Sequence, residues 1–207
     1  DMSTYTTQND VSVLVAQNGY FNITGLAESY EVQHGTSMLS NFTITSLGNS
    51  RANIVITIDS DDINITYSQD PEDMDNSEIG LSQVPPGQHV TVYMNITAPL
   101  GYRGDYPFEV DASNDNDPRH EIHLSSDVEV PFNRSWEVNR QSHVINGVYG
   151  QDGIDQGIVI TSWANAPLHF NITLHNLSMI QNITGIQQVT ALETYVIPLD
   201  YSVPAEN

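Results

Sequence analysis

Residues 83–113, QVPPGQHVTVYMNITAPLGYRGDYPFEVDAS, contain the clearest strand pattern in the chain. After the turn signal at residues 85–87, apolar side chains occupy every second position from Val90 to Ile96, a period of two that buries one face of a strand. Beyond a glycine-bracketed turn at residues 100–104, apolar residues alternate again from Tyr106 to Val110. The stretch therefore predicts two consecutive, antiparallel, half-buried strands of a β-sandwich.

The rest of the chain extends this interpretation. Strands are expected at residues 39–47 and 52–58, which we interpret as a pair, and Val, Ile, Thr and Tyr are abundant while helical periodicity is nearly absent. The predicted class is all-β. We expect one β-sandwich over residues 17–131, and residues 132–207 form either a second small β domain or the completion of the first.

A family resemblance rests on these residues. The order Pro-Gly, alternating apolar residues, Ala98-Pro99, then Gly104-x-Tyr106-x-Phe108 resembles the closing hairpin of the immunoglobulin-like and fibronectin-type-III-like domains of archaeal and bacterial cell-surface proteins. Residues 40–49 and 52–58 are similar to an earlier strand, glycine turn and strand of the same domains. The resemblance covers about residues 26–131 and implies an adhesive or structural module, with no particular chemistry.

The N-terminal residues 1–16 are predicted to form an extended strand in which Val11, Val13 and Val15 alternate with other residues. In size, sequon density and extended N-terminus the chain resembles the subunits of archaeal surface threads and bundling pili. That resemblance implies a donor strand that inserts into the next copy of the same chain and pairs with an open sheet edge. An ordinary first strand of the domain is the alternative.

Composition limits the possible partners. The chain has 207 residues with a formal net charge of −21, five arginines, no lysine and no cysteine. This charge repels nucleic acid and anionic lipid headgroups. It favours the binding of cations or basic partners and a salty habitat, or it serves only to keep the protein soluble. The sequence has no apolar run long enough for a membrane span, and its start at Asp1 suggests a mature secreted protein.

Eight Asn-x-Ser/Thr sequons are the strongest functional signal, because the composition would give about three by chance. In a strand, the Asn and Thr of Asn-Ile-Thr point to one face and the Ile to the core, so a sugar can sit outside a folded strand. The alternative is a plain polar-apolar-polar strand. We expect N-linked glycans at Asn22, Asn41, Asn64, Asn95, Asn133, Asn171, Asn176 and Asn182.

Two acidic segments raise the question of calcium. Residues 69–78 are most simply a solvated loop. The second segment offers oxygen ligands of the kind that calcium takes, at Asp111, Asn114, Asp115 and Asp117, although their spacing departs from that of an EF-hand loop. Calcium at this segment is a prediction, and no cofactor is required.

Catalytic motifs are missing from the sequence: it has no cysteine nucleophile, no Gly-x-Ser-x-Gly elbow and no zinc-binding His-Glu-x-x-His helix. We therefore expect a non-enzymatic protein. The sequons, the acidic composition and the resemblance to archaeal thread and pilus subunits imply an extracellular structural subunit of an N-glycosylated archaeal filament or surface layer. A carbohydrate- or cell-binding module is the second hypothesis, with stacking faces from Trp136, Trp163, Tyr93 and Tyr102. An extracellular hydrolase, supported only by the many carboxylates, is the third.

Overall fold

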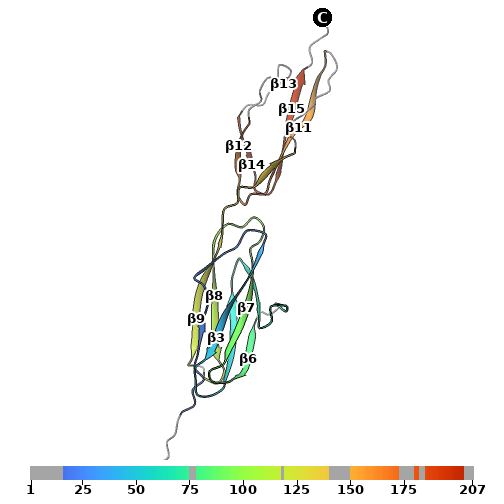
Figure 1. Ribbon diagram of the computed structural model, residues 1–207. Coiled ribbons are helices and arrows are strands. Elements are labelled where there is room, and N and C mark those ends of the chain that lie inside the picture. The colour runs from blue at the N-terminus through green and yellow to red at the C-terminus, as the bar shows by residue number, and fades with distance from the viewer. Residues whose placement is uncertain are drawn as a thin grey trace, which may run out of the picture.

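The computed structural model describes residues 16–74, 78–117, 119–139, 150–172, 180–181 and 185–202. The regular elements of these residues are all strands, which form two β-units placed end to end (Figure 1). Among the described residues, no helix is long and apolar enough to cross a membrane. The predicted all-β class is confirmed.

The first unit contains nine strands in two facing sheets. They are β1 (Phe21–Thr24), β2 (Ser29–Glu31), β3 (Ser37–Ser46), β4 (Ala52–Asp59), β5 (Asn64–Ser68), β6 (Ile79–Val84), β7 (His89–Thr97), β8 (Gly104–Asn114) and β9 (Glu121–Val130). One sheet has the order β1-β3-β7-β5 and the other the order β2-β9-β8-β4-β6. From β1 to β8 the chain changes sheet at every connection.

This strand order is that of an immunoglobulin-like sandwich, in which strands ABED form one sheet and GFC the other. The strand β2 adds to the edge of the second sheet by pairing in parallel with β9. At the opposite edge, β6 pairs with β4 although β5 lies between them in the chain. The predicted Ig-like β-sandwich fold is therefore confirmed.

The core of the first unit lies between the two sheets. Alternate residues of every long strand point into it, including Phe42, Ile96 and Val110, all of which are fully buried. Tyr67 of β5 also enters this core, and its hydroxyl accepts a hydrogen bond from the Ile58 amide of the facing sheet at 3.0 Å. Side chains of both sheets thus share one continuous apolar layer.

The strands predicted at residues 83–113 are present, but the predicted pairing between them is wrong. β7 pairs with β3 on one side and β5 on the other, so both of its edges are occupied. The chain therefore crosses to the other sheet through residues 98–103, where Gly101 has a φ of 88°, and β8 pairs with β4 and β9. The expected pairing of residues 39–47 with 52–58 is wrong for the same reason, because β1 and β7 flank β3.

The second unit consists of β10 (Trp136–Val138), β11 (Asp152–Ser162), β12 (Leu168–Ile172), β13 (Ile180–Gln181), β14 (Gly185–Val189) and β15 (Thr194–Ser202). Its larger sheet has the order β10-β11-β15-β13, and β12 pairs with β14. Ile160, Val189 and Ile197 are the buried apolar cluster of its described residues.

One buried carboxamide joins the two units. Asn165, 4% exposed, lies in the loop after β11 and donates from Nδ2 to the carbonyl oxygens of Tyr102 at 2.8 Å and Pro131 at 2.9 Å. Its Oδ1 accepts from the backbone N–H of Asn133 at 2.9 Å. The side chain thus binds the second unit to a loop of the first and to the connecting segment.

Candidate functional site

Four of the predicted sequons lie on a single sheet of the first unit. Asn22, Asn41, Asn95 and Asn64 belong to β1, β3, β7 and β5, the four strands of that sheet in spatial order. The cross-strand register puts them on the same side. Side chains two residues apart on a strand point to the same side, so Tyr93 and Asn95 share one side of the sheet. Asn41 is opposite Tyr93, while Leu39 and Thr66 are both opposite Asn95.

The middle residue of each of these sequons points the other way. Phe42 and Ile96 are fully buried, and Ile23 and Ile65 pack against the same core. The Asn and Thr of each tripeptide therefore share the outer face. The predicted division of β7, with core residues on one side and Asn95 on the other, is confirmed.

We call this outer surface the sequon face. By register it comprises Asn22, Thr24, Ser37, Leu39, Asn41, Thr43, Thr45, Asn64, Thr66, Ser68, His89, Thr91, Tyr93, Asn95 and Thr97. None of these residues is a carboxylate or an arginine, although the chain carries 26 acidic residues. Hydroxyl groups pair across its strands, as in the 2.8 Å contact between Ser37 Oγ and Thr97 Oγ1.

The four asparagines of the sequon face differ in their surroundings. Asn41 and Asn64 are exposed, and Asn95, on the inner strand β7, is half-buried. Asn22 is also half-buried, and its Oδ1 is a buried oxygen without a hydrogen-bond partner among the described residues. The asparagine of the Asn-x-Thr tripeptide thus differs in solvent exposure from strand to strand.

The other predicted sequons lie outside this face. Asn171 is exposed on β12. Asn133 is half-buried in the connecting segment between the units. Asn176 and Asn182 fall outside the described residues, as do Val11, Val13 and Val15 of the predicted donor strand.

The opposite side of the sandwich carries the acidic residues. We define the carboxylate face as the outward carboxylates of the five-stranded sheet: Glu31, Asp59, Asp105, Glu109, Asp111, Glu121, Asp127 and Glu129. Glu129 is directly opposite both Glu31 and Asp105, and Asp59 is directly opposite Glu109. This face was not among our predictions, although every acidic residue of residues 105–111 and 121–129 falls at an odd-numbered position, a period of two that signals it.

One histidine, His123, lies among these carboxylates. His123 Nδ1 lies 2.6 Å from Asp111 Oδ1, and its Nε2 lies 3.6 Å from Glu121 Oε2. The hydrogen bond to Asp111 and the nearby negative charges raise the pKa of His123 above its ordinary value. The carboxylates of this face therefore stabilise the imidazolium form of His123 relative to an isolated histidine.

The four residues predicted for calcium have separate contacts. Asp111 binds His123, and Asp117 Oδ1 accepts from Arg119 Nε at 3.0 Å, a hydrogen bond that lowers the pKa of Asp117. Asn114 is buried; its Nδ2 donates to the Gly19 carbonyl and its Oδ1 accepts backbone N–H groups. Asp115 lies in the following turn. Calcium binding stays a prediction, and the described residues form no metal-binding group of three His, Cys, Asp or Glu side chains.

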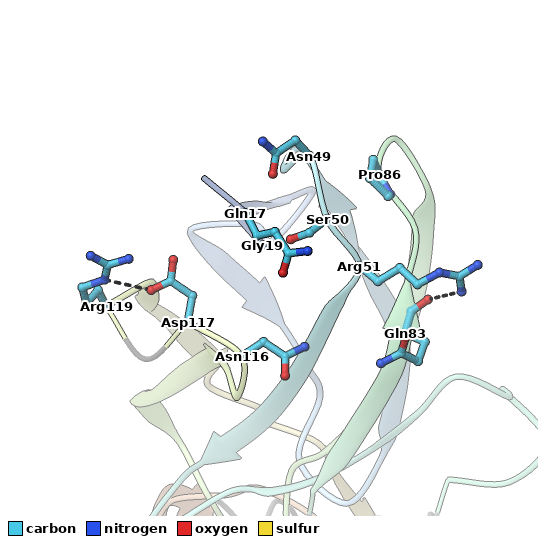
Figure 2. A pocket seen from close by; sticks show the side chains of 10 residues that line it. All are labelled: Gln17, Gly19, Asn49, Ser50, Arg51, Gln83, Pro86, Asn116, Asp117 and Arg119. Atoms are coloured by element: carbon cyan, nitrogen blue, oxygen red, sulfur yellow. Dashed lines mark hydrogen bonds and ion pairs between the residues drawn. The ribbon is translucent and has the colours of Figure 1, made fainter. Parts of the chain in front are cut away.

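An open polar pocket lies at the end of the sandwich near residues 16–20 (Figure 2). It is lined by Gln17, Gly19, Asn49, Ser50, Arg51, Gln83, Pro86, Asn116, Asp117 and Arg119. Both guanidinium groups bind within the protein: Arg119 pairs with Asp117, and Arg51 Nη1 donates to the Gln83 carbonyl at 3.2 Å. We therefore assign no ligand to this pocket.

The aromatic residues considered for carbohydrate stacking are divided between the units. Trp136 and Trp163 of the second unit are each 52% exposed, and Trp136 packs edge-on against Phe170 at a centroid distance of 5.0 Å. Tyr93 is half-buried on the sequon face, whereas Tyr102 packs against the core and Tyr106. The structure does not bring these four residues together.

No family model and no curated protein matches the chain. Similar solved structures include a family 123 glycoside hydrolase from Clostridium perfringens, with 13% identity over 49% of this chain and 22% of that chain, at a TM-score of 0.39. They also include the class 5 fimbriae chaperone CfaA, with 11% identity over 90% and 87% of the two chains, at a TM-score of 0.34. The periplasmic chaperone SfaE has 11% identity over 86% of each chain, also at a TM-score of 0.34.

Proposed function

We propose that this protein is a non-enzymatic structural subunit of an extracellular, N-glycosylated archaeal filament, with copies of the chain linked by β-strand complementation. One observation carries the glycan part of the proposal: the four Asn-x-Thr tripeptides of the sequon face all direct Asn and Thr outward and their middle residue into the core. Sugars at these positions require no change in the core. A component of a surface layer would need the same outward-facing sequons and is the alternative form of this function.

The linkage between copies is supported by the open edges of the sheets. Among the described strands, β1 and β5 border the sheet that carries the sequon face, and each has a neighbour on one side only. Unpaired backbone groups at such edges accept an added strand by main-chain hydrogen bonding. The alternating valines of residues 11–15 would supply that strand from a second copy.

Intact mass spectrometry of the protein secreted by its source organism tests the glycan part. We expect a mass above that of the bare polypeptide by several identical glycan increments. A mass equal to that of the polypeptide would contradict the proposal.

Deletion of residues 1–16 tests the linkage. We expect the full chain to form filaments and the shortened chain to remain a folded monomer, as judged by electron microscopy and circular dichroism. A synthetic peptide of residues 1–16 should then bind to the shortened chain. Filaments that persist after the deletion would rule out this donor strand.

A second candidate function, a carbohydrate- or cell-binding module, is favoured by the exposure of Trp136 and Trp163. Binding to a glycan array, lost in the double variant Trp136→Ala/Trp163→Ala and retained in Tyr93→Ala, would support it. Equal array signals for all three proteins would count against it.

A further inference from the structure

We propose that the sequons are used selectively: Asn41 and Asn64 carry glycans, Asn95 is largely spared because it lies between them, and the Asn133 carboxamide instead fixes the segment between the two units to the sandwich. This inference rests on the proposed N-glycosylation and names which positions take the sugar. It follows from the register of the sequon face and from the contacts of the connecting segment.

Asn41 and Asn64 have accessible acceptor nitrogens. An N-linked glycan is joined to the side-chain nitrogen of Asn, so that atom must face solvent. Both residues are exposed, and neither carboxamide takes part in a hydrogen bond within the described part of the chain. A sugar on either residue displaces no contact of the fold.

Asn95 is placed diagonally between these two residues. Asn41 is opposite Tyr93 and Asn64 is opposite Thr97, so each is offset by two residues from Asn95 on a neighbouring strand. Diagonal neighbours of this kind lie about 7–8 Å apart. The strand spacing and rise put Asn41 and Asn64 roughly 17 Å from each other.

Two glycans therefore fit at the outer positions, but a third at Asn95 is crowded from both sides. Asn95 is in addition half-buried, since β7 has a strand on each side. A glycan on either neighbour covers the approach to its side chain. Occupancy of Asn95 should thus depend on whether Asn41 and Asn64 are modified.

Asn133 has a different role, because its carboxamide is already bound on both sides. Its Nδ2 lies 2.8 Å from Nε2 of His34, a residue that is only 9% exposed. An amide nitrogen can only donate, so Nε2 of His34 accepts this bond. Asn133 Oδ1 accepts from the backbone N–H of Ser135 at 2.9 Å and from its hydroxyl at 2.6 Å.

These contacts continue into the buried side chain that joins the units. The backbone N–H of Asn133 donates to Asn165 Oδ1, and Asn165 binds Tyr102 and Pro131 of the first unit. Asn133 thus stands between His34 of the sandwich and Asn165 of the second unit. A sugar on its Nδ2 would have to replace or distort the bond to His34 inside this junction.

Site-resolved glycopeptide mass spectrometry of the protein secreted by its source tests the selective use. We expect high occupancy at Asn41 and Asn64, low occupancy at Asn95 and none at Asn133. In the double variant Asn41→Gln/Asn64→Gln, occupancy at Asn95 should rise several-fold. The matched variant Thr43→Val/Thr66→Val, which keeps both asparagines but destroys their sequons, should give the same rise.

The outcomes separate this inference from the proposed function. Bare polypeptide at every position would overturn both. Glycans that are present at Asn133, or an Asn95 occupancy that is unchanged in both double variants, would overturn the selective use and leave the glycoprotein function standing.

The junction has its own test, with unglycosylated protein made in a bacterial host. Because the chain has no cysteine, spin labels can be attached to Ser82→Cys and Thr194→Cys, one exposed residue in each unit. We expect the distance distribution between the labels to broaden in Asn133→Ala and in Asn165→Ala, and to stay unchanged in Asn41→Ala. An unchanged distribution in Asn133→Ala would overturn the role assigned to Asn133, whatever the result for Asn165→Ala.

Discussion

The two outer faces of the sandwich differ sharply although one core lies behind both. The sequon face has no carboxylate or arginine at any of its outward positions, whereas the carboxylate face carries eight acidic residues. On the first, hydroxyl groups such as those of Ser37 and Thr97 pair across strands. On the second, Glu129 faces Glu31 and Asp105 directly.

This difference shows that the core and the surface of a sandwich are specified separately. Alternation requires only that every second residue be apolar, so the remaining positions are open to other demands. Like charges directly opposite each other destabilise a sheet, which means that the acidic rows do not serve the fold. The charge of each face is therefore independent of the core that lies behind it.

The largest expected change in stability follows from substitution of the middle residue of a sequon. Phe42→Ala should lower the free energy of unfolding by about 3–5 kcal/mol, since it empties a fully buried position of the core. Asn41→Ala, one residue away on the sequon face, should change it by less than about 0.5 kcal/mol. Denaturant unfolding of the unglycosylated protein measures both. Similar losses for the two variants would contradict the assignment of faces.

A gain in stability is expected at Asn22. Its buried Oδ1 has no partner among the described residues, and an unsatisfied buried polar group costs roughly 1–3 kcal/mol. Asn22→Val, which also suits a strand, should therefore raise the unfolding free energy by about 1 kcal/mol. The control is Asn41→Val at an exposed position, for which we expect a smaller change. A less stable Asn22→Val protein would contradict the cost assigned to this oxygen.

Removal of one negative charge should reduce the electrostatic repulsion between residues of the carboxylate face. Glu129→Thr separates Glu31 from Asp105 and should stabilise the protein by roughly 0.2–1 kcal/mol at low ionic strength. The gain should shrink in high salt, because exposed charges are screened. Thermal unfolding at two salt concentrations measures it. Asp127→Thr, with only Ser29 and Pro107 directly opposite, is the control, and equal gains for both variants would argue against repulsion along the row.

The smallest expected change in stability is the pH-dependent contribution of His123. Its pKa is raised in the folded state, so its contribution to stability is fully present below the unfolded pKa of about 6.5 and is lost as pH rises through the folded value. An NMR titration should show the raised pKa in the wild type and a lower one in Asp111→Asn. A titration that is the same in both proteins would contradict the role of Asp111.

Alternation in the sequence predicted the strands at residues 83–113 and the orientation of Asn95 correctly. It could not predict their partners, because a hairpin and a crossing between sheets bury the same side chains. What excludes the hairpin is long-range: β3 and β5 occupy both edges of β7. The contact of Asn133 with His34 likewise joins residues 99 positions apart, which no local pattern indicates.

The sequence by itself determined which residues point inward and which outward, since a strand's side chains alternate whatever its neighbours are. Only the tertiary structure decided which outward residues meet. The chain changes sheet at each connection from β1 to β8, so the sequons of β1, β3, β5 and β7 gather on one face and the acidic residues of β2, β4, β8 and β9 on the other. Strand order depends on hydrogen bonds between distant segments, and therefore one repeated tripeptide became a single surface only in the folded protein.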